Sequence, residues 1–587
     1  MKVKRLIEKT IQNQIGGIED PSKITLEPTN PKFEGDFTFV VFPFLKHLKK
    51  KPEEAATFLG EIIYKEIPKI ESFNVVKGFL NLKLSDQVWL EYFQEIIKDP
   101  YHGRNLYGKN KKVMVEYSSP NTNKPLHLGH IRNNLLGYSI AEILKYNGFK
   151  VIKSNLINDR GIHICKSMWA WQKTGNQETP ISSQIKGDHL VGKYYVIFDK
   201  LYKGEINELK AQGLSQSEAE KKSKIMRETR EMLQKWERGD EEIRALWSKM
   251  NSWVYEGFKE TYQKLGVDFD KFYYESETYL LGKEIVKAGL NNAVFFQKED
   301  GSIWVDLQNE NLDQKLLLRA DGTSVYITQD IGTADLKYKE FKVDQSIYVV
   351  GNEQDYHFKV LKVILEKLKK PYSKGVFHLS YGMVDLPSGK MKSREGTVVD
   401  ADDLMREMIA TAAKQTQELG KTNGLSFEEL EVLHKQIGLG ALKYFLLKVD
   451  PQKRLLFDPE ESIDFHGNTG PFLQYTFARI NSLLSEQEIT DDFDLNFEVN
   501  IEEKNLLVLV TEFPAKVQEA GQSFSPALVS NYLYELAKCY NRFYQNNPIL
   551  KSNLPQKKAF RLALCKETKR VLKEGLCLLG IDTPKRM

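Results

Sequence analysis

The sequence predicts an α/β protein whose central part is a doubly wound parallel sheet, preceded by a small α+β domain and followed by helices. An apolar, β-branched run at Val113–Tyr117 leads through a loop into a helix whose apolar periodicity begins near Leu128. A second β-rich run at Lys150–Asn158 completes a βαβ unit. Two further runs, Leu316–Thr328 and Gln345–Val350, are separated by helical stretches, as a doubly wound sheet requires. We therefore expect a ligand crevice at the carboxyl ends of these strands.

The composition is typical of a globular chain with several domains. The 587 residues suggest about three or four domains, and 41% hydrophobic residues exclude the low hydrophobicity of disordered proteins. A formal net charge of +4 permits a nucleic-acid partner through local patches but does not predict one. Because the chain has neither an apolar run long enough to span a membrane nor a basic-then-apolar leader, we expect a cytoplasmic protein without membrane contact.

The cysteines do not indicate a metal site. The four positions are Cys165, Cys539, Cys565 and Cys577. They show no CxxC pair and no other zinc-type spacing, so we interpret them as reduced and mostly buried thiols. We therefore expect no protein-bound structural metal.

The loop after Val113–Tyr117 carries a pair of histidines. His127, Gly129 and His130 stand at a helix N-terminus, where unpaired N–H groups and the positive end of the helix dipole attract phosphate. Gly129 leaves room for a ligand to approach the backbone. The two imidazoles are three residues apart, so both can face the same phosphates, either as protonated donors or as neutral donors through one nitrogen. Alone, such a pair is more often an ordinary surface or capping pair.

Its context resembles a known family. Residues 118–130 read SSPNTNKPLHLGH and resemble the HIGH signature of class I aminoacyl-tRNA synthetases, in the extended form of arginyl-tRNA synthetases. The match is carried by Ser118, Ser119, Pro120, Asn121, Lys124, Pro125, His127, Gly129 and His130. Residues 381–399 read YGMVDLPSGKMKSREGTVV, by composition a solvated turn, and resemble the second class I signature, KMSKS. The two signatures stand in the right order, about 260 residues apart, which makes coincidence unlikely.

The resemblance covers nearly the whole chain and implies its domains. They are an α+β tRNA-contacting domain at 1–105, a Rossmann-like catalytic domain at 106–400 with a helical insertion at about 182–266, connecting helices at 401–465, and a helical anticodon-binding domain at 466–587. Within the first domain, the pattern of Lys32–Lys51 favours a small core with a solvated basic edge. A surface on which Phe rings stack bases is the alternative.

The activity implied by the resemblance is the joining of arginine to its tRNA. Arginine and ATP would give arginyl-adenylate and pyrophosphate, and the arginyl group would pass to the 3′-terminal adenosine of the tRNA, with Mg²⁺ accompanying ATP. We expect a monomer. The expected catalytic residues are Lys124, His127, Gly129, His130 and Lys390, and the expected ATP-binding residues are Ser118, His127, His130, Met383, Val384 and Lys390. Catalysis would rest on aligning the arginine carboxylate with the α-phosphate and stabilising the developing charge.

Selecting a guanidinium over an ammonium needs carboxylates at fixed geometry. We expect Glu116 and Asp330 to supply them, with Tyr326 as a hydroxyl acceptor and an aromatic wall. In the resemblance, Tyr326 and Asp330 correspond to the pair that grips the arginine side chain, and Gln354 to a group near its backbone end. Asn121 is a further arginine-binding candidate. Taken alone, Tyr326 and Asp330 are more often a packing ring and a helix cap.

The end of the chain also matches the family. Residues 467–480 resemble the opening of the anticodon domain, and the ending GIDTPKRM resembles that of arginyl-tRNA synthetases. We expect Phe472, Tyr475, Tyr540 and Met587 to border the anticodon loop, because single-stranded bases are read by stacking. The conventional interpretation of these aromatic residues is that they belong to a core.

Two departures and two rival functions stay open. Ser393 stands where the second signature usually has its second lysine, and we expect Lys124 to supply the charge, with Lys392 as competitor. Asp159 in the N-D-x-G segment is followed by Arg160 in place of the usual aromatic residue, and receives no role. Another class I synthetase, for cysteine or glutamate, would show zinc-type cysteines or lack the carboxylate pair. A non-synthetase relative, either an adenylyl transferase or a tRNA-binding protein without catalysis, would not need both signatures.

Overall fold

The structure is a computed structural model that describes residues 2–16, 23–30, 32–385, 399–418, 424–490, 493, 497–552 and 554–587. The chain divides into two compact units, which we describe one at a time. The first consists of Met1–Gly103, Ile480–Pro514 and Glu535–Val571, and the second of Arg104–Arg479, Ala515–Tyr534 and Leu572–Met587. The domain boundaries expected from the sequence stay a prediction.

The first unit contains a four-stranded antiparallel sheet in the order β1-β2-β4-β3. Its strands are β1 (Glu27–Pro28), β2 (Phe37–Val40), β3 (Ile70–Val76) and β4 (Phe79–Leu84). The helices before, among and after them are α1 (Lys2–Gln14), α2 (Leu45–Leu48), α3 (Pro52–Glu66) and α4 (Asp86–Ile97). Helix α3 packs closely on the sheet, because a Cβ added at Gly60 would lie 2.4 Å from the ring of Phe73. The α+β arrangement expected at the start of the chain is confirmed.

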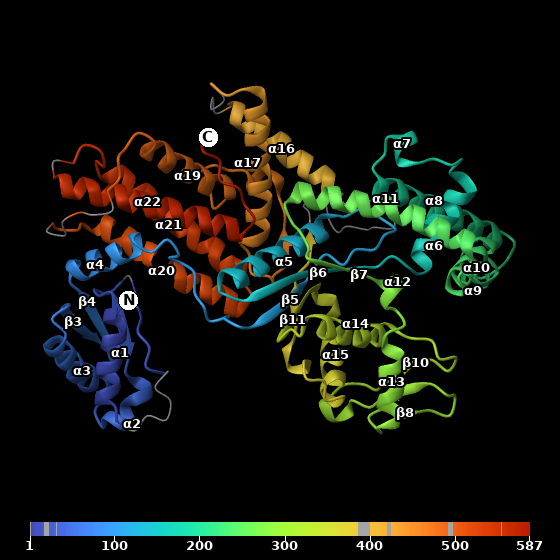
Figure 1. Cartoon of the computed structure of the whole chain (residues 1–587), viewed down its shortest axis with the longest axis horizontal. Helices are drawn as coiled ribbons and strands as arrows, with labels where there is room; N and C mark the ends of the chain where they lie inside the picture. The colour runs from blue at the N-terminus through green and yellow to red at the C-terminus, as the bar shows by residue number, and fades with distance from the viewer. Residues whose placement is uncertain are drawn as a thin grey trace. The chain divides into compact units, whose positions relative to one another are not determined.

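The second unit is built on a five-stranded parallel sheet in the order β12-β11-β5-β6-β7 (Figure 1). The strands are β5 (Lys112–Glu116), β6 (Lys150–Ile157), β7 (Lys271–Tyr274), β11 (Gln345–Gly351) and β12 (Val376–Tyr381). From the central β5 the chain adds β6 and β7 on one side and later β11 and β12 on the other. Ligands of such sheets bind where the order reverses, beyond the carboxyl ends of β5 and β11. The predicted doubly wound sheet is confirmed.

One strand belongs to a different sheet from the one expected. The sequence places the run Leu316–Thr328 in the parallel sheet, but β10 (Lys315–Leu318) pairs with β9 (Ile303–Val305) and, through it, with β8 (Phe296–Gln297). These three strands form a separate antiparallel sheet, and α14 (Tyr326–Phe341) begins before the run ends. Composition identified a strand correctly, but the sheet that a strand joins is decided by tertiary packing.

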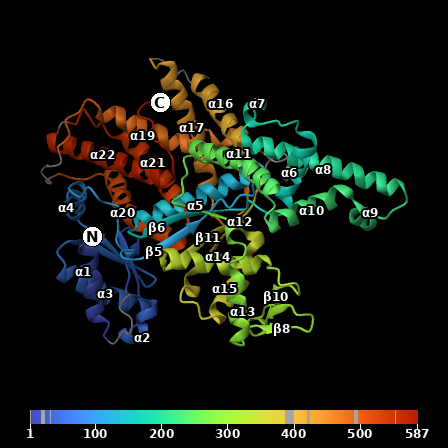
Figure 2. The same ribbon diagram turned by 45° about the vertical axis from the view of Figure 1, so that its right-hand side comes forward.

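Helices cover both faces of the parallel sheet (Figures 1 and 2). Helix α5 (Leu128–Tyr146) lies on one face against β6 and β11, and α16 (Ala401–Glu418) and α17 (Phe427–Leu447) pack on α5. Helix α14 and α15 (Asp355–Lys367) lie on the other face, in a core shared with β9 and β10. Because α5 is enclosed by the sheet and by helices, even its polar residues Arg132 and Asn133 are buried.

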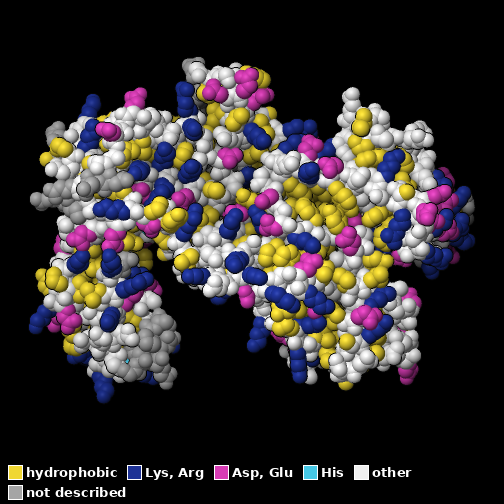
Figure 3. All heavy atoms as spheres, in the orientation of Figure 1, with side chains coloured by type: hydrophobic (Ala, Val, Ile, Leu, Met, Phe, Trp, Pro, Cys, Tyr) yellow, Lys and Arg dark blue, Asp and Glu magenta, His cyan; other side chains and the backbone are white. Residues whose placement is uncertain are grey.

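A group of helices is inserted between β6 and β7. They are α6 (Ile162–Thr174), α7 (Pro180–Ser183), α8 (Gly187–Ala211), α9 (Gln216–Lys222), α10 (Lys224–Arg238) and α11 (Glu241–Leu265). Helix α8 packs against both α6 and α11. Figure 3 shows basic and acidic side chains mixed densely over α9 and α10, as expected for a solvated helical insertion. The buried Asp159 ties this insertion to the sheet, because its carboxylate accepts hydrogen bonds from the Tyr255 hydroxyl and the Ser276 amide.

The C-terminal part of the chain is helical. Its long helices are α19 (Gly470–Leu484), α20 (Ile501–Ser523), α21 (Pro526–Asn546) and α22 (Pro555–Leu578). Within the second unit, the Lys443 ammonium donates to the Gly580 carbonyl at 2.5 Å and the Gln474 amide donates to the Asp582 carbonyl at 2.8 Å, so the tail is anchored. All four cysteines are free thiols. Among the described residues, no helix is both long and apolar enough to cross a membrane.

Candidate active site

Several polar residues, some of them singled out in the sequence, lie just beyond the carboxyl ends of the parallel strands. The loop 118–130 follows β5, and Asp159 follows β6. Gln354 and His357 follow β11, and Glu275 follows β7. Since the carboxyl ends of parallel strands meet at one edge of a sheet, residues distant in sequence converge on the expected crevice.

The loop after β5 has an unusual backbone conformation. Ser118 and Ser119 have φ angles of +76° and +44°, in the left-handed region that non-glycine residues rarely adopt. The Asn133 side chain accepts a hydrogen bond from the Ser118 amide at 2.5 Å, and Asn155 accepts one from the Ser119 amide at 3.1 Å. The buried Ser118 hydroxyl lies 2.6 Å from the Tyr262 hydroxyl. These contacts hold the loop in a conformation that costs free energy, as is common at functional sites.

His127 and His130 form a close pair at the start of α5, with ring centroids 3.9 Å apart. The Nδ1 atom of His127 accepts a hydrogen bond from the Gly129 amide at 3.1 Å, and Nδ1 of His130 accepts one from the His127 amide at 3.2 Å. Because each Nδ1 is an acceptor, the hydrogen of each neutral imidazole is on Nε2. Of the two alternatives left open by the sequence, the geometry favours neutral donors.

The surroundings of the two imidazoles keep them neutral. Burial, together with the positive charge of Lys124, lowers the pKa of His127 to about 3. Burial also lowers the pKa of His130 well below its usual value, and His127 and Lys124 lower it further. At pH 7 the pair therefore offers two Nε2–H donors without net charge, beside helix amide groups that attract anions. This arrangement is suited to phosphate oxygens.

Arg132, which the sequence analysis missed, ties α5 to the segment before the second signature. Its guanidinium is fully buried and donates to the carbonyls of Gly382 and Lys453, both at 2.9 Å. Longer hydrogen bonds reach the carbonyls of Met383, Asp450 and Pro451. The only sequence signal for this role of Arg132 was an arginine at a position of the helix where apolar residues face inward. The hydrogen bond from Arg132 therefore fixes Gly382, which lies just before residues 386–398, to α5.

The segment after the second signature is also fixed to the histidine loop. The Leu128 amide donates to the Val399 carbonyl at 3.1 Å, and the Ala401 amide donates to the Leu126 carbonyl at 3.0 Å. Both flanks of 386–398 are therefore held by α5 or the loop before it. Between these flanks, Lys390, Lys392, Ser393 and Arg394 lie outside the described residues.

A second polar group is formed by residues after β7, in α14 and after β11. Tyr326, the first residue of α14, is 78% exposed, and Asp330 follows one turn later. The Asp330 carboxylate lies 2.6 Å from Nε2 of His357, to which the sequence analysis gave no role. Gln354 is exposed at the end of a short turn after β11. The tyrosine and the aspartate are thus accessible on the same side of α14.

Glu275 is a further carboxylate that the sequence analysis missed. Burial raises the pKa of Glu275 to about 7, Arg160 at 4.0 Å opposes the rise, and the negative charges of Asp159 and Asp330 add to it. A carboxylate whose pKa is raised by another carboxylate gains from a cation placed near both. The only sequence signal that could have identified Glu275 as a site residue was its position directly after a β-rich run.

Glu116 has a partner within the protein. Its Oε2 atom lies 2.5 Å from Nζ of Lys337, and both side chains are almost fully buried. The Lys337 ammonium also lies over the ring of Tyr348, 4.7 Å from the centroid. A carboxylate that is already neutralised by a buried lysine is not available as the main partner of a guanidinium. The structure therefore gives Glu116 a different role from the one expected, in a buried ion pair.

Models of known protein families match most of the chain. The family described as tRNA synthetases class I (R), catalytic domain, matches residues 94–458, which is more than half of the chain. The chain belongs to the arginyl-tRNA synthetase family. In this synthetase the arginyl tRNA synthetase N terminal domain matches residues 1–84, and the DALR anticodon binding domain matches residues 473–587.

Curated relatives agree with this assignment, and two solved structures share the fold. The synthetase is 53% identical to the arginine–tRNA ligase of Parabacteroides distasonis over 98% of each chain, and 51% identical to that of Flavobacterium psychrophilum over 100% of each. The solved structure of arginyl-tRNA synthetase from Thermus thermophilus has a TM-score of 0.83 at 24% identity, covering 100% of both chains. The one from Plasmodium falciparum has a TM-score of 0.77 at 21% identity, covering 100% of this chain and 98% of that one. These two structures share the fold.

The aromatic residues expected to meet the anticodon differ in accessibility in this synthetase. Phe472 and Tyr475 on α19 and the terminal Met587 are partly exposed. The ring of Phe472 packs edge-on against that of Tyr534, with centroids 5.6 Å apart. Tyr540, in contrast, is 0% exposed, so its ring offers no face on which a base could stack. The expectation for Tyr540 is therefore corrected to a core position.

The three remaining expected site residues differ in exposure. Asn121 is exposed, and its backbone forms a parallel bridge with Asn158. Met383 is 36% exposed. Val384, 2% exposed, lies in β13 (Val384–Asp385), so its side chain belongs to the protein interior.

One cluster has the residue types of a metal site. Ligand atoms of Asp188, His189 and Asp402 all lie within 4.8 Å of one another. The Lys186 ammonium, however, lies 2.6 Å from Asp402 Oδ2 and 3.3 Å from Asp188 Oδ2. Because the Lys186 ammonium already pairs with both carboxylates, we interpret the group as an ion-pair cluster.

Proposed function

We infer that this synthetase activates arginine with ATP, releasing pyrophosphate, and then transfers the arginyl group from arginyl-adenylate to the 3′-terminal adenosine of its tRNA. The observation that carries this proposal is the placement of a neutral histidine pair and a pair of carboxylates at the same edge of one sheet. The first suits phosphate oxygens and the second suits a guanidinium.

In the first step, the arginine carboxylate attacks the α-phosphorus and pyrophosphate leaves, so no covalent enzyme intermediate is needed. The Nε2–H groups of His127 and His130 donate to phosphate oxygens, where negative charge develops. Lys124, on the loop before them, adds a positive charge, and Gly129 lets the phosphates approach the backbone. Mg²⁺, bound with ATP, neutralises part of the phosphate charge. We keep Lys390 as a further cation and Ser118, Met383 and Val384 as neighbours of the nucleotide.

The guanidinium is proposed to bind between Asp330 and Glu275. The Glu275 carboxylate is raised in pKa by burial and by the charge of Asp330, and an arginine side chain would relieve that repulsion. A planar fork of donors can bond two carboxylates at once, whereas a lysine ammonium is a point charge. Tyr326 would line the stem of the side chain. Gln354 and Asn121 are proposed to meet the α-amino and carboxylate end.

The tRNA is proposed to contact both ends of the chain. In the first unit, Phe42 and Phe79 are 45% and 40% exposed and pack edge to face, with centroids 5.6 Å apart. Within Lys32–Lys51, Phe39 and Phe44 are buried, as the core interpretation predicts, whereas the exposed ring of Phe42 offers a face on which a base could stack. At the C-terminal end we propose Phe472, Tyr475 and Met587. We further propose that the protein is a cytoplasmic monomer.

One assay tests the function. Purified tRNA is charged with each of the twenty amino acids in turn, with ATP and Mg²⁺ present. Charging by arginine alone is expected, because two facing carboxylates reject neutral side chains and hold lysine less well. Charging by another amino acid, or none with arginine, would overturn the proposal.

A further inference from the structure

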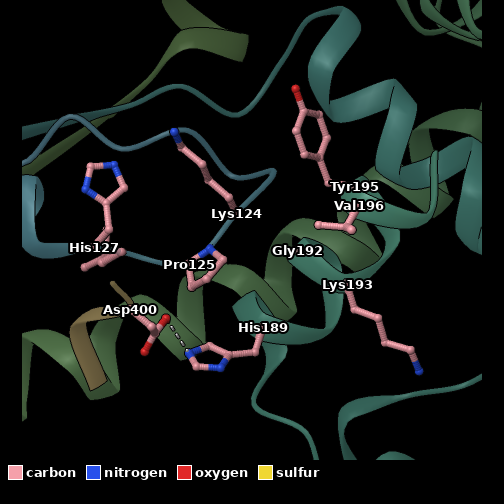
Figure 4. A pocket seen from close by; sticks show the side chains of 10 residues that line it. Lys124, Pro125, His127, His189, Gly192, Lys193, Tyr195, Val196 and Asp400 are labelled. Atoms are coloured by element: carbon pink, nitrogen blue, oxygen red, sulfur yellow. Dashed lines mark ion pairs between the residues drawn. The ribbon is translucent and has the colours of Figure 1, made fainter. Parts of the chain in front are cut away.

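The start of α8, in the helical insertion, reaches the segment after the second signature (Figure 4). Nε2 of His189 lies 3.3 Å from Asp400 Oδ2 and 3.4 Å from Asp402 Oδ2. The other oxygen of Asp400 caps α16, because Oδ1 accepts from the amides of Asp402 and Asp403 at 2.9 and 3.1 Å. A single carboxylate thus fixes the start of one helix and contacts the imidazole of another.

Asp400 is also part of the backbone pairing with the histidine loop. It stands opposite His127 in an antiparallel bridge, flanked by the hydrogen bonds that join Leu128 to Val399 and Ala401 to Leu126. His127, His189 and Asp400 line a common cavity of about 220 Å³ together with Lys124 (Figure 4).

Helix α8 contacts the other side of this cavity as well. A Cβ added at Gly192 would lie 2.8 Å from Cδ of Pro125, the residue that follows Lys124. The insertion therefore touches both segments of the backbone pair, at Pro125 through close packing and at Asp400 through a side-chain contact.

We propose that His189 is a positioning residue for adenylate formation. Its imidazolium joins α8 to Asp400, holds residues 399–401 against residues 126–128, and thereby fixes Lys124 and His127 for the phosphates. His189 acts through Asp400 and contacts no substrate. The inference rests on the proposed function, because it assigns a role in the ATP-dependent step.

The charges around His189 favour the protonated form. The facing groups are Lys186 just before α8, Asp188 within α8, Asp400 and Asp402 at the start of α16, and Lys264 of α11, which lies near Asp402. Burial and Lys186 lower the pKa of His189, but the ion-pair contact with the Asp402 carboxylate and the charges of Asp188 and Asp400 outweigh them, so the pKa is raised. The charged bridge is complete below this raised pKa and is lost as the pH rises through it.

The test compares His189→Gln and His189→Lys in arginine-dependent ATP–pyrophosphate exchange with tRNA present, across pH 6 to 9. His189→Gln should lower kcat by roughly tenfold at neutral pH and leave the KM for arginine unchanged, since the carboxylate pair is untouched. It should also remove the alkaline decline of kcat that we expect in the natural protein. His189→Lys should keep the natural rate but show no decline, because lysine stays charged throughout.

A matched control is His163→Gln. His163 on α6 lies 3.1 Å from the hydroxyl of Tyr195 on the same helix α8 but belongs to a different contact. This variant should keep both the rate and the alkaline decline. Equal losses in the two glutamine variants would mean that His189 only supports the packing of α8, and would overturn the proposal.

A double variant tests whether His189 acts through Asp400. Asp400→Asn retains an oxygen that can cap α16, so any decrease of kcat in this variant should reflect the missing charge. If the two residues act as one bridge, His189→Gln with Asp400→Asn should lower kcat no further than the worse single variant. If the decrease of kcat in the double variant is the product of the two single decreases, the inference is overturned. A kcat in His189→Gln equal to that of the natural protein would also overturn it. Either result leaves the proposed function standing as long as the natural protein charges tRNA with arginine, and absence of that charging would overturn the function itself.

Discussion

The phosphate end and the arginine end of the site are built in opposite ways. At the phosphate end, His127 and His130 are neutral, and their Nδ1 atoms are satisfied by backbone amides of the same helix turn. At the arginine end, burial raises the pKa of the Glu275 carboxylate, and the negative charges of Asp159 and Asp330 add to the rise. The first group is complete without substrate, whereas the second gains when a cation arrives.

This difference indicates where binding free energy is used. A preorganised set of donors loses little on binding ATP and can be aimed at the charge that develops during the reaction. Two carboxylates that repel each other favour the ligand that neutralises both, so they contribute mainly to the choice of amino acid. Changes at the arginine end should therefore alter KM for arginine, and changes at the phosphate end should alter kcat. The first three predictions below test this division, and the fourth tests the tRNA contact, from the largest expected effect to the smallest.

Asp330→Asn keeps the shape of the side chain but removes its charge. The KM for arginine should rise by about a hundredfold or more, since an uncompensated buried charge costs several kcal/mol, while the KM for ATP should change little. The measurement is steady-state tRNA charging at varied arginine. His357→Gln is the matched control, because it removes the partner at 2.6 Å but leaves the carboxylate. Unchanged arginine affinity in Asp330→Asn would remove this residue from the site.

Lys124→Ala should lower the rate of adenylate formation by roughly a hundredfold, or about 3 kcal/mol, because the charge is used chiefly in the transition state. Lys392→Ala should have a mild effect. Exchange of pyrophosphate into ATP, with tRNA present, measures both. Lys193→Ala is a control on the same cavity, since its ammonium is already paired with Glu178 at 2.8 Å. The reverse ranking of the first two variants would transfer the role to Lys392.

Glu275→Gln should raise the KM for arginine by roughly tenfold, because one of two neutralising charges is lost. It should also change the pH dependence of kcat/KM for arginine. In the natural protein, kcat/KM for arginine should fall as the pH drops below about 7, where Glu275 becomes protonated in the free enzyme. In the glutamine variant this decline should be absent. A natural decline that persists in Glu275→Gln would assign it to another group.

Deletion of residues 584–587 leaves both anchors of the tail, the carbonyls of Gly580 and Asp582, in place. The KM for tRNA should rise by about five- to tenfold, the low end of what one stacked base contributes. The unfolding temperature should be unchanged. Charging kinetics with cognate tRNA provide the measurement, and a normal KM for tRNA would argue against contact between the tail and the anticodon.

Local pattern was enough to predict much of this site. The strand, loop and helix around HLGH are consecutive in the chain, so periodicity and helix-terminus rules place His127 and His130 without knowledge of the rest. The second signature was identified only by its resemblance to KMSKS, because its composition is that of a solvated turn, and Lys390 and Lys392 lie outside the described residues. Tyr326 and Asp330 stand at a helical spacing of four, and their common side follows directly.

Contacts between distant segments were not predictable. Glu116 and Lys337 are separated by more than two hundred residues, and nothing near either one shows that they form a buried pair. The same holds for Glu275, whose carboxylate is perturbed by Asp330 of another segment, and for Arg132, which bonds carbonyls beyond residue 380. Burial also decided the role of Tyr540, because an aromatic residue in a periodic helix gives the same sequence pattern whether it faces a core or a base.

The sequence by itself determined the fold class, the phosphate-facing helix start and the family resemblance, because these depend on the order and spacing of neighbouring residues. The tertiary structure alone decided the protonation of the histidine pair, the partner of each carboxylate and the sheet to which β10 belongs. The physical reason is that burial and electrostatic interaction depend on distance in space, and the parallel sheet brings residues from distant parts of the chain to one edge.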